Sequence, residues 1–151
     1  MRHGETNPGI GYNDDFNRKL SDKGINKLKR LNEVLQKKGA QFDLLIKSPA
    51  LRTKQTAELI SDNLKVKEQK IEEDIYESSL ENLLEVINHL PDHFGNVLMV
   101  GHNPGINSLL AYLTNDFHIS LLPGMMADVT FDLPEWKMLS KGSGCLNEVL
   151  Q

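Results

Sequence analysis

Segments with helical spacing of apolar residues alternate with short apolar runs along this chain, and this alternation constrains the fold most. The clearest run, residues 96–102 (Asn-Val-Leu-Met-Val-Gly-His), has the length and composition of a buried strand. Residues 43–48 form a similar run with polar ends. Strands that alternate with helices are usually joined by crossovers and pair in parallel, so the pattern predicts an α/β fold with a mostly parallel sheet.

Capping residues indicate where the predicted helices begin and end. Ser21 is a suitable N-cap for a helix over 22–38, and Gly39 is a suitable stop. The apolar stripe of this helix consists of Ile25, Leu28, Leu31 and Leu35. Three further helices are predicted to begin near Pro49, Ser79 and Pro104.

The remaining β-rich stretches are more polar. Residues 66–73 predict a short edge strand. Residues 127–133 alternate with period two and predict a strand, paired as a hairpin with 135–142 through Pro134.

Composition bounds the class of protein. A chain of 151 residues with 39% hydrophobic and 25% charged residues predicts a single globular domain over 1–151. Its net charge of −4 argues against a nucleic-acid partner, since nucleic acids are bound by basic surfaces. The single cysteine, Cys145, excludes an internal disulfide, and no apolar run reaches the ~18 residues of a membrane span. No signal-peptide pattern opens the sequence, so we expect a cytoplasmic protein without membrane contact.

The first residues, Met1 to Thr6, place Arg2, His3 and Gly4 before any hydrophobic segment. This start is either a frayed polar terminus or a functional turn that follows a strand. Parallel sheets bind ligands beyond the carboxyl ends of their strands, and a functional His3 would need an inner strand to lead into it. We therefore expect the natural protein to have several more apolar residues upstream, with Met1 as the last residue of a first strand that is missing or truncated here.

Two histidines stand beside glycines at predicted strand ends. His3 precedes Gly4, and His102 follows Gly101. Small residues at such positions let a ligand approach the backbone closely. A metal site formed by His3 and His102 is a competing interpretation, whereas His89, His93 and His118 receive no role.

Arginines occur at similar junctions. Arg2 is next to His3, Arg18 precedes the first predicted helix, and Arg52 lies in the first turn of the second. The N-terminus of a helix attracts anions, and a guanidinium adds bidentate hydrogen bonds to phosphate oxygens. A lone arginine in a first turn is usually solvated, but together with the two histidines these arginines indicate a phosphate site.

Three motifs in order, "RHGET", "SPALRTKQTAE" and "VGHNPG", resemble the histidine phosphatase superfamily, which has the phosphoglycerate mutase-like fold. The resemblance covers essentially the whole chain. Within the superfamily, "NRKLSDKG", "IYESS" and the closing Trp-Lys-x-Leu segment are most similar to bacterial phosphohistidine phosphatases of the SixA type.

The resemblance implies a three-layer αβα sandwich and a phosphatase that works without a metal or cofactor. His3 would be the nucleophile and would form a covalent phosphohistidine, which water then hydrolyses. The implied catalytic residues are His3, Arg2, Arg52, His102 and Glu77. The implied substrate-binding residues are Gly4, Arg18, Ser48, Gly101 and Asn103.

Glu77 has two interpretations. In relatives with acid catalysis a carboxylate occupies this position, so Glu77 is a candidate general acid or polar positioning residue. Alternatively, it is a surface glutamate before the helix cap at Ser79. Imidazole is a better leaving group than an alkoxide and needs less help from an acid.

The short intervals between the motifs predict an open site, which favours a phosphorylated side chain on another protein over a small metabolite. The leading hypothesis is therefore a phosphohistidine phosphatase whose substrate is a phosphorylated protein, a histidine phosphotransfer domain being one candidate. The alternatives are a phosphomonoesterase for a small phosphorylated metabolite and a non-catalytic phosphate-binding module. The oligomeric state is not predicted.

Overall fold

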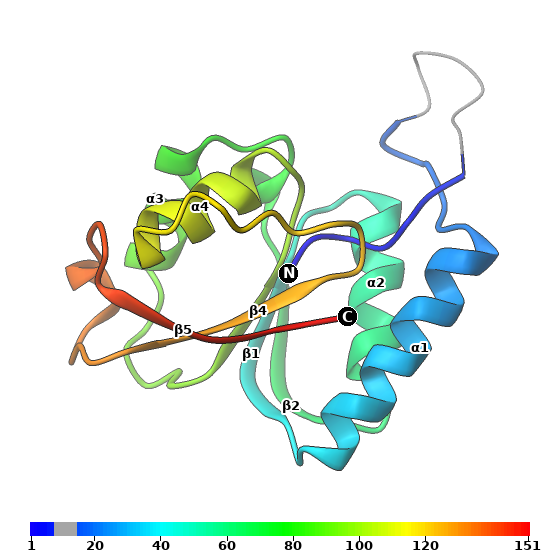
Figure 1. The fold of residues 1–151 in the computed structure, drawn as a ribbon, viewed down its shortest axis with the longest axis horizontal. Helices are drawn as coiled ribbons and strands as arrows, with labels where there is room; N and C mark the ends of the chain where they lie inside the picture. Colours follow the sequence, from blue (N-terminus) through cyan, green and yellow to red (C-terminus); the bar gives the residue numbers. More distant parts are fainter. Residues whose placement is uncertain (8–14) are drawn as a thin grey trace.

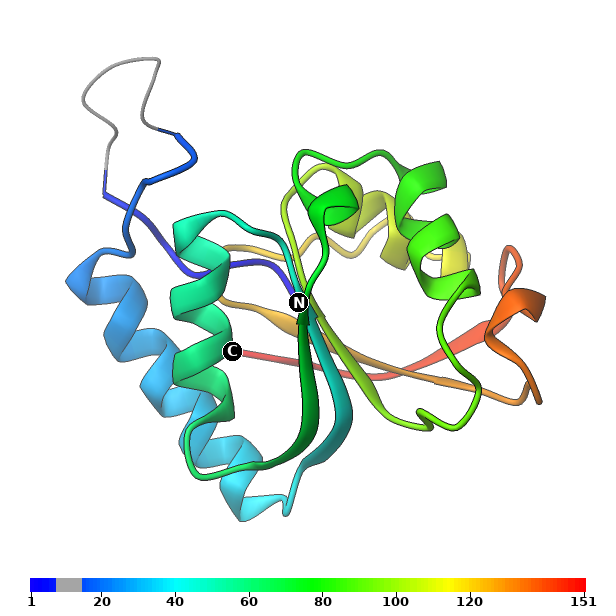
Figure 2. The ribbon, with the colours of Figure 1, turned by 180° about the vertical axis from the view of Figure 1, so that it is seen from behind.

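The computed structural model describes residues 1–7 and 15–151 and consists of helices packed on both faces of a sheet (Figures 1 and 2). Its longer elements are, in chain order, α1 (Asp22–Lys37), β1 (Gln41–Lys47), α2 (Leu51–Ser61), β2 (Lys65–Ile71), α3 (Leu80–Asn88), β3 (Val97–Val100), α4 (Gly105–Thr114), β4 (Met126–Phe131) and β5 (Gly144–Leu150). Single 3₁₀ turns, η2 and η3, cover Glu73–Ile75 and Trp136–Met138. None of the helices in the described residues is long and apolar enough to cross a membrane.

The sheet has a parallel part and an antiparallel part. Strands β2, β1 and β3 pair in parallel in that order, which confirms the predicted parallel sheet and the edge position of β2. Strand β1 occupies the centre, and its residues Leu44, Leu45 and Ile46 are buried. Strands β4 and β5 form a separate antiparallel ladder, with a register shift between Asp128 and Val129.

Two apolar cores lie on opposite faces of the parallel strands. Helices α1 and α2 cover one face, and α3 and α4 cover the other (Figures 1 and 2). Residues of β3 alternate between them: Leu98 and Val100 pack with the α1 and α2 core, and Met99 packs with the α3 and α4 core. Because both faces are covered, an inner strand must be apolar throughout, which explains the continuous run in the sequence.

The predicted caps form. Ser21 accepts a hydrogen bond from the Gly24 amide at the start of α1, and Ser79 accepts one from the Asn82 amide at the start of α3. Each cap satisfies an amide that has no partner within its own helix.

The first three residues lie within the sheet. Arg2 forms a parallel bridge with Gly101, because Met1 O accepts from the Gly101 amide and the His3 amide donates to Gly101 O. On its other side, the Arg2 amide donates to Met125 O. Met1 and His3 are both buried, so the interpretation as a frayed terminus is wrong.

The predicted partner of the C-terminal hairpin is wrong. Strand β4 pairs with β5 at Gly144–Leu150, not with residues 135–142. Part of that stretch forms the turn η3 instead, because Trp136 is held by other segments: its amide donates to Asp92 Oδ1 and its indole N–H donates to Phe94 O.

Candidate active site

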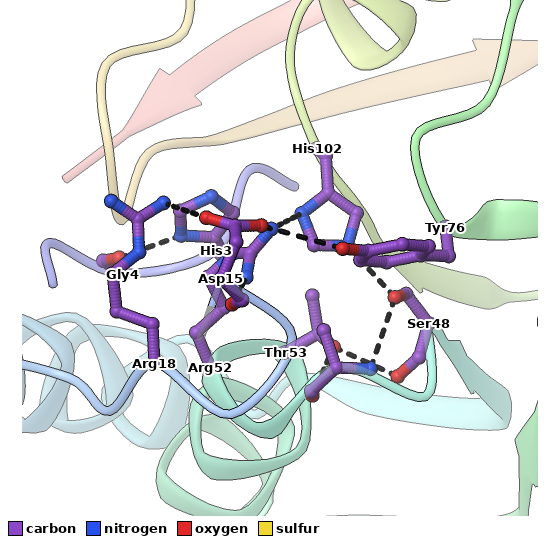
Figure 3. A network of polar contacts seen from close by, with 10 residues as sticks. His3, Gly4, Asp15, Arg18, Ser48, Arg52, Thr53, Tyr76 and His102 are labelled. Atoms are coloured by element: carbon purple, nitrogen blue, oxygen red, sulfur yellow. Dashed lines mark hydrogen bonds and ion pairs between the residues drawn. The ribbon is translucent and has the colours of Figure 1, made fainter. Parts of the chain in front are cut away.

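Three strand-end segments meet at the carboxyl edge of the parallel strands (Figure 3). They are the turn at His3 and Gly4, the connection from Ser48 into α2, and the loop that begins at His102. The rings of His3 and His102 lie 5.2 Å apart between centroids, and the Ser48 amide donates to Val100 O. Chain segments 100 residues apart therefore place their polar side chains in one cluster, as expected at this edge of a parallel sheet.

His3 is oriented by its own turn. Its Nδ1 lies 2.7 Å from Gly4 O, and a carbonyl oxygen can only accept, so the proton must be on Nδ1. This tautomer leaves Nε2 unprotonated. Burial, followed by the charges of nearby arginines, lowers the pKa of His3 from 6.5 to about 4, although the bond to Gly4 acts in the opposite direction. At neutral pH, Nε2 therefore carries a free lone pair.

His102 has the opposite tautomer. Its Nδ1 accepts a hydrogen bond from Nη2 of Arg52 at 3.1 Å, so its proton is on Nε2, which donates to Ser48 Oγ at 2.7 Å. Burial, together with the charges of Arg52 and His3, lowers the pKa of His102 to about 3. The ring is neutral, and it fixes the guanidinium of Arg52 beside it.

Arg52 is the most buried of the three arginines, with 3% of its surface exposed. It lies in the first turn of α2, where the positive end of the helix dipole also favours an anion. Its guanidinium donates to the backbone oxygen and to Oδ2 of Asp15.

Asp15 was not among the predicted site residues. Its carboxylate joins Arg52 at 2.9 Å and Arg18 at 2.8 Å, and the hydroxyl of Tyr76 lies 3.4 Å from it (Figure 3). Burial raises the pKa of Asp15, but the charges of Arg52 and Arg18 outweigh this and hold it below its ordinary value. Asp15 therefore forms ion pairs with two guanidinium groups. In the absence of this carboxylate, both groups could bind a phosphoryl group.

The arginines have spare donors. Within residues 1–7 and 15–151, the Nε atoms of Arg2, Arg18 and Arg52 are buried and have no hydrogen-bond partner, and the same holds for Oδ1 of Asn103. Arg2 and Asn103 both donate to Leu121 O, from Nη1 and Nδ2 respectively, each at 3.1 Å. Buried donors without partners are unfavourable unless a ligand satisfies them.

Two threonines of α2, which the sequence analysis did not predict, form hydrogen bonds to the backbone of the cluster. Thr56 accepts a hydrogen bond from the Gly4 amide at 2.9 Å and donates to Arg52 O at 2.6 Å. Thr53 donates to the backbone oxygen of Ser48 at 2.8 Å. Their positions three residues apart on one helix face are the signal that could have identified them.

The two predicted glycines are closely packed by apolar side chains. A Cβ on Gly4 would lie 2.7 Å from Leu28, and one on Gly101 would lie 3.0 Å from Ile75 and Ile106. The space around both residues is therefore limited, and the predicted role in ligand approach stays a prediction.

Glu77 is not brought into the cluster. It is exposed, and among the described residues it forms no hydrogen bond or ion pair. Its backbone has φ = 46°, in the left-handed region. The neighbouring Tyr76 faces the site instead, with its ring edge-on to His102 at 5.4 Å between centroids.

The arrangement suits an anion better than a metal ion. In the described part of the chain, no group of three His, Cys, Asp or Glu side chains could hold a metal. Three guanidinium groups and one neutral histidine with a free Nε2 could instead bind the oxygens of a phosphoryl group and attack its phosphorus.

Comparisons with known proteins agree with the motifs. The sequence profile of the histidine phosphatase superfamily (branch 1) matches residues 1–85. An uncharacterized protein of Picosynechococcus is 36% identical over 61 residues, which cover 40% of this chain and 37% of that protein.

Solved structures share the fold over the full length of the chain. A SixA protein of Nakamurella multipartitia superposes with a TM-score of 0.84 at 20% identity, and the match covers 100% of this chain and 92% of that one. A protein histidine phosphatase SixA complexed with tungstate gives a TM-score of 0.83 at 21% identity, over 100% of this chain and 94% of the other.

Proposed function

This chain belongs to the histidine phosphatase superfamily, and from that premise we propose that it hydrolyses phosphoryl groups carried on protein histidines, using His3 as a covalent nucleophile. The observation that carries the proposal is the fixed tautomer of His3, with Nδ1–H donated to Gly4 O and Nε2 unprotonated. We also infer that residues 1–151 act as one domain, since the site combines residues from Arg2 to Asn103.

In the first step, the lone pair of His3 Nε2 attacks the phosphorus, and the bond from phosphorus to the leaving nitrogen of the substrate breaks. The leaving imidazole keeps that electron pair and takes a proton from solvent. In the second step, water attacks the phosphorus of the phosphohistidine, the P–Nε2 bond breaks, and inorganic phosphate leaves. His3 returns to its starting tautomer because Gly4 O retains the proton on Nδ1.

Arg2, Arg18 and Arg52 would stabilise the charge on the three equatorial oxygens during both steps. Each has a buried Nε–H without a partner in the described residues, so part of its hydrogen-bonding capacity is not used within the chain. Positively charged donors that are fixed before the reaction supply most of the stabilisation in phosphoryl transfer. His102 would act by holding Arg52 through their 3.1 Å bond.

Apart from Asp15, no carboxyl group lies in the described cluster. This supports a substrate that has a good leaving group. Asp15 is ionised and bound to two arginines, and Glu77 is exposed without a hydrogen bond to the described cluster, so neither is held in place as a proton donor. An alkoxide from a serine or sugar phosphate would need such a donor, whereas imidazole from phosphohistidine needs it less. The likeness in fold to SixA proteins agrees with this choice of substrate.

The test is phosphate release from a ³²P-phosphohistidine protein by the chain and by its His3→Ala variant. We expect the parent to release phosphate and to retain acid-labile label on itself, and the variant to lose at least about a thousandfold in rate and all of the label. His89→Ala is the matched control, because His89 is exposed and its Nδ1 also lies 2.8 Å from a backbone oxygen. Equal release by His3→Ala and the parent would exclude the covalent mechanism.

A second substrate separates the two enzyme hypotheses. We expect release from a phosphoserine peptide to be slower than from the phosphohistidine protein at equal concentration. Faster release from phosphoserine would instead indicate a phosphomonoesterase, and tungstate binding without any turnover would indicate a binding module.

A further inference from the structure

An exposed aromatic ring lies beside the cluster of arginines. Phe16 belongs to a turn at residues 15–17, and 41% of its surface is exposed. The backbone of this turn is bound to the start of α2, since Phe16 O accepts from the Leu51 amide at 3.0 Å and Asp15 O accepts from Arg52. The turn therefore places the exposed ring directly after a residue that contacts the site.

The Phe16 ring is the outermost of a series of neighbouring rings. It lies edge-on to the ring of Tyr76, at 5.3 Å between centroids, and Tyr76 lies edge-on to His102 at 5.4 Å. His102 in turn lies 5.2 Å from His3. The two histidines are buried, Tyr76 is half-buried and Phe16 is exposed. Aromatic surface therefore leads from the proposed nucleophile to solvent.

Asp15 adds a negative charge at the same place. Its side chain is 41% exposed and that of Arg52 is 4% exposed, so the carboxylate is on the solvent side of their ion pair. Figure 3 shows this carboxylate between Arg18 and Tyr76, whose hydroxyl lies 3.4 Å from Oδ2. Within the described residues, Oδ1 accepts from Arg18 alone, so it has a lone pair for a donor from a ligand.

A carboxylate next to aromatic rings suits a ligand group that is both aromatic and positively charged. The carboxylate accepts a charge-assisted hydrogen bond from an N–H⁺ group, and aromatic rings attract a cation. A phosphoryl group has neither property and is repelled by the carboxylate. The group that uses these contacts is therefore the part of the substrate to which the phosphoryl group is attached.

The imidazole ring of phosphohistidine has both properties when it is protonated on the nitrogen that does not carry phosphorus. We propose, on the basis of the proposed function, that Asp15, Phe16 and Tyr76 form a subsite for this protonated ring, which we call the imidazole subsite. Asp15 accepts the hydrogen bond from the ring N–H, and the two aromatic side chains pack against the ring.

The imidazole subsite acts in the first step of the reaction. The ring takes its proton from solvent before the P–N bond breaks, and Asp15 stabilises this charged form. The Nε2 lone pair of His3 then attacks phosphorus, and the electron pair of the breaking P–N bond returns to the ring. The ring leaves as neutral imidazole rather than as an anion. A phosphoserine side chain has no ring and no N–H⁺, so it gains nothing from these contacts.

The experiment measures binding to the His3→Ala variant of the full chain, which lacks the nucleophile. Two peptides of otherwise identical sequence, one with phosphohistidine and one with phosphoserine, are compared by fluorescence anisotropy at pH 6.5, where about half of ordinary imidazole rings are protonated. We expect the phosphohistidine peptide to bind about tenfold more tightly. Phe16→Leu and Asp15→Asn, each combined with His3→Ala, should reduce this preference to about twofold or less.

The ratio of the two dissociation constants isolates the ring, because any effect of Asp15→Asn on the phosphoryl group is common to both peptides. Phe117→Leu and Asp74→Asn are the matched controls and should keep the tenfold preference. Phe117 is exposed and packs with Lys141, and Asp74 is an exposed residue of η2. With His3 intact, the ratio of kcat/KM for the two peptides should fall in the same variants, which gives a second readout.

Equal binding of the two peptides to His3→Ala would overturn the imidazole subsite. A preference that survives both Phe16→Leu and Asp15→Asn would also overturn it, as would an equal loss of preference in the two controls. Preferential binding of phosphohistidine through these residues, without phosphate release by the parent, would support the subsite and contradict the proposed hydrolysis alone. The two failures are therefore distinct.

Discussion

At the scale of single residues, the proposed function depends on where two protons reside. The bond from His3 to Gly4 O fixes one on Nδ1, and the bond from Arg52 to His102 fixes the other on Nε2. The two rings are therefore not equivalent: the Nε2 lone pair of His3 is free, and the Nδ1 lone pair of His102 accepts a hydrogen bond from Arg52. Exchanging their roles would require breaking both bonds.

The lowered pKa of His3 predicts the pH dependence of the reaction. With a pKa of about 4, Nε2 is unprotonated from about pH 5 upward, so kcat/KM should rise between pH 3 and 5 and then stay level to pH 7 as far as His3 is concerned. The measurement is kcat/KM for the phosphohistidine protein between pH 3.5 and 8, over the range in which the chain stays folded. A rise centred near pH 6.5 would show that burial does not keep His3 neutral.

Asp15 predicts a change in anion affinity. Its carboxylate neutralises part of the charge of Arg52 and Arg18, so Asp15→Asn should bind tungstate about fivefold more tightly, which corresponds to about 1 kcal/mol. Isothermal titration calorimetry at fixed ionic strength measures this. The control is Asp74→Asn, an exposed residue of η2 that gives the same change in net charge. Weaker binding by Asp15→Asn alone would mean that the carboxylate positions the arginines.

The sequence predicted the histidines of the cluster because they stand at strand ends beside glycines. It predicted the arginines because they stand next to a histidine or at the start of a helix, where local patterns also carry information. It did not predict Asp15 or Tyr76, whose contacts join positions 61 residues apart and follow no local rule. Glu77 was selected over its neighbour Tyr76 because the resemblance pointed to a carboxylate. The backbone of Glu77 is left-handed, with φ = 46°, a conformation that sequence patterns do not reveal.

At the scale of elements, two helices start in the same way. The first turn of α1 contains Gly24, and α4 begins at Gly105; a Cβ on either would lie within 2.3 Å of a backbone oxygen, that of Glu5 or Ser78. In both cases a loop that leads toward the site lies directly on the start of the helix. The two glycines therefore allow the contacts that fix the loops carrying His3 and Tyr76.

Gly24→Ala tests this contact through the sign of its effect. In an isolated helix the change would stabilise by roughly 1 kcal/mol, but here the methyl group would meet Glu5 O at 2.2 Å, so we expect a loss of about 2 kcal/mol or more. Urea unfolding monitored by circular dichroism measures the free energy. Asn26→Ala, at an exposed position of α1, should be neutral or slightly stabilising. A gain in stability for Gly24→Ala would mean that the segment at Glu5 yields easily.

Most element types were predictable, since periodicity, caps and glycine stops are local. The partner of β4 was not, because the choice between 135–142 and β5 depends on the bonds of Trp136 to Asp92 and Phe94. These bonds join positions 44 and 42 residues apart in the sequence, so no local pattern reveals them.

At the scale of the whole molecule, the site depends on the two parts of the sheet being held together by residues 1–3. The buried groups there and at His102 are neutral in the folded state, so their protonation opposes folding. Lowered pKa values mean that the unfolded chain binds more protons between the folded and ordinary pKa, and stability must rise with pH over that interval.

The free energy of unfolding should therefore fall as the pH falls from 8 to 5, through the amine of Met1, and from 6.5 to about 3–4, through His3 and His102. His3→Asn should remove about 3 kcal/mol of this variation between pH 7 and 4. Urea unfolding at pH 8, 6.5, 5 and 4 measures the profile, and the exposed His118→Asn should leave it as in the parent. A flat profile in the parent would contradict burial of these groups.

The inward position of Met1 also has a practical consequence for handling the protein. Met1 is buried and its nitrogen donates to Met99 O, so a group attached to that nitrogen would enter the interior of the fold. A polar affinity tag fused before Met1 would direct charged residues into a cavity of about 850 Å³ that is lined by Met1 and by apolar residues of β3 and β4, whereas a tag fused after the exposed Gln151 would not.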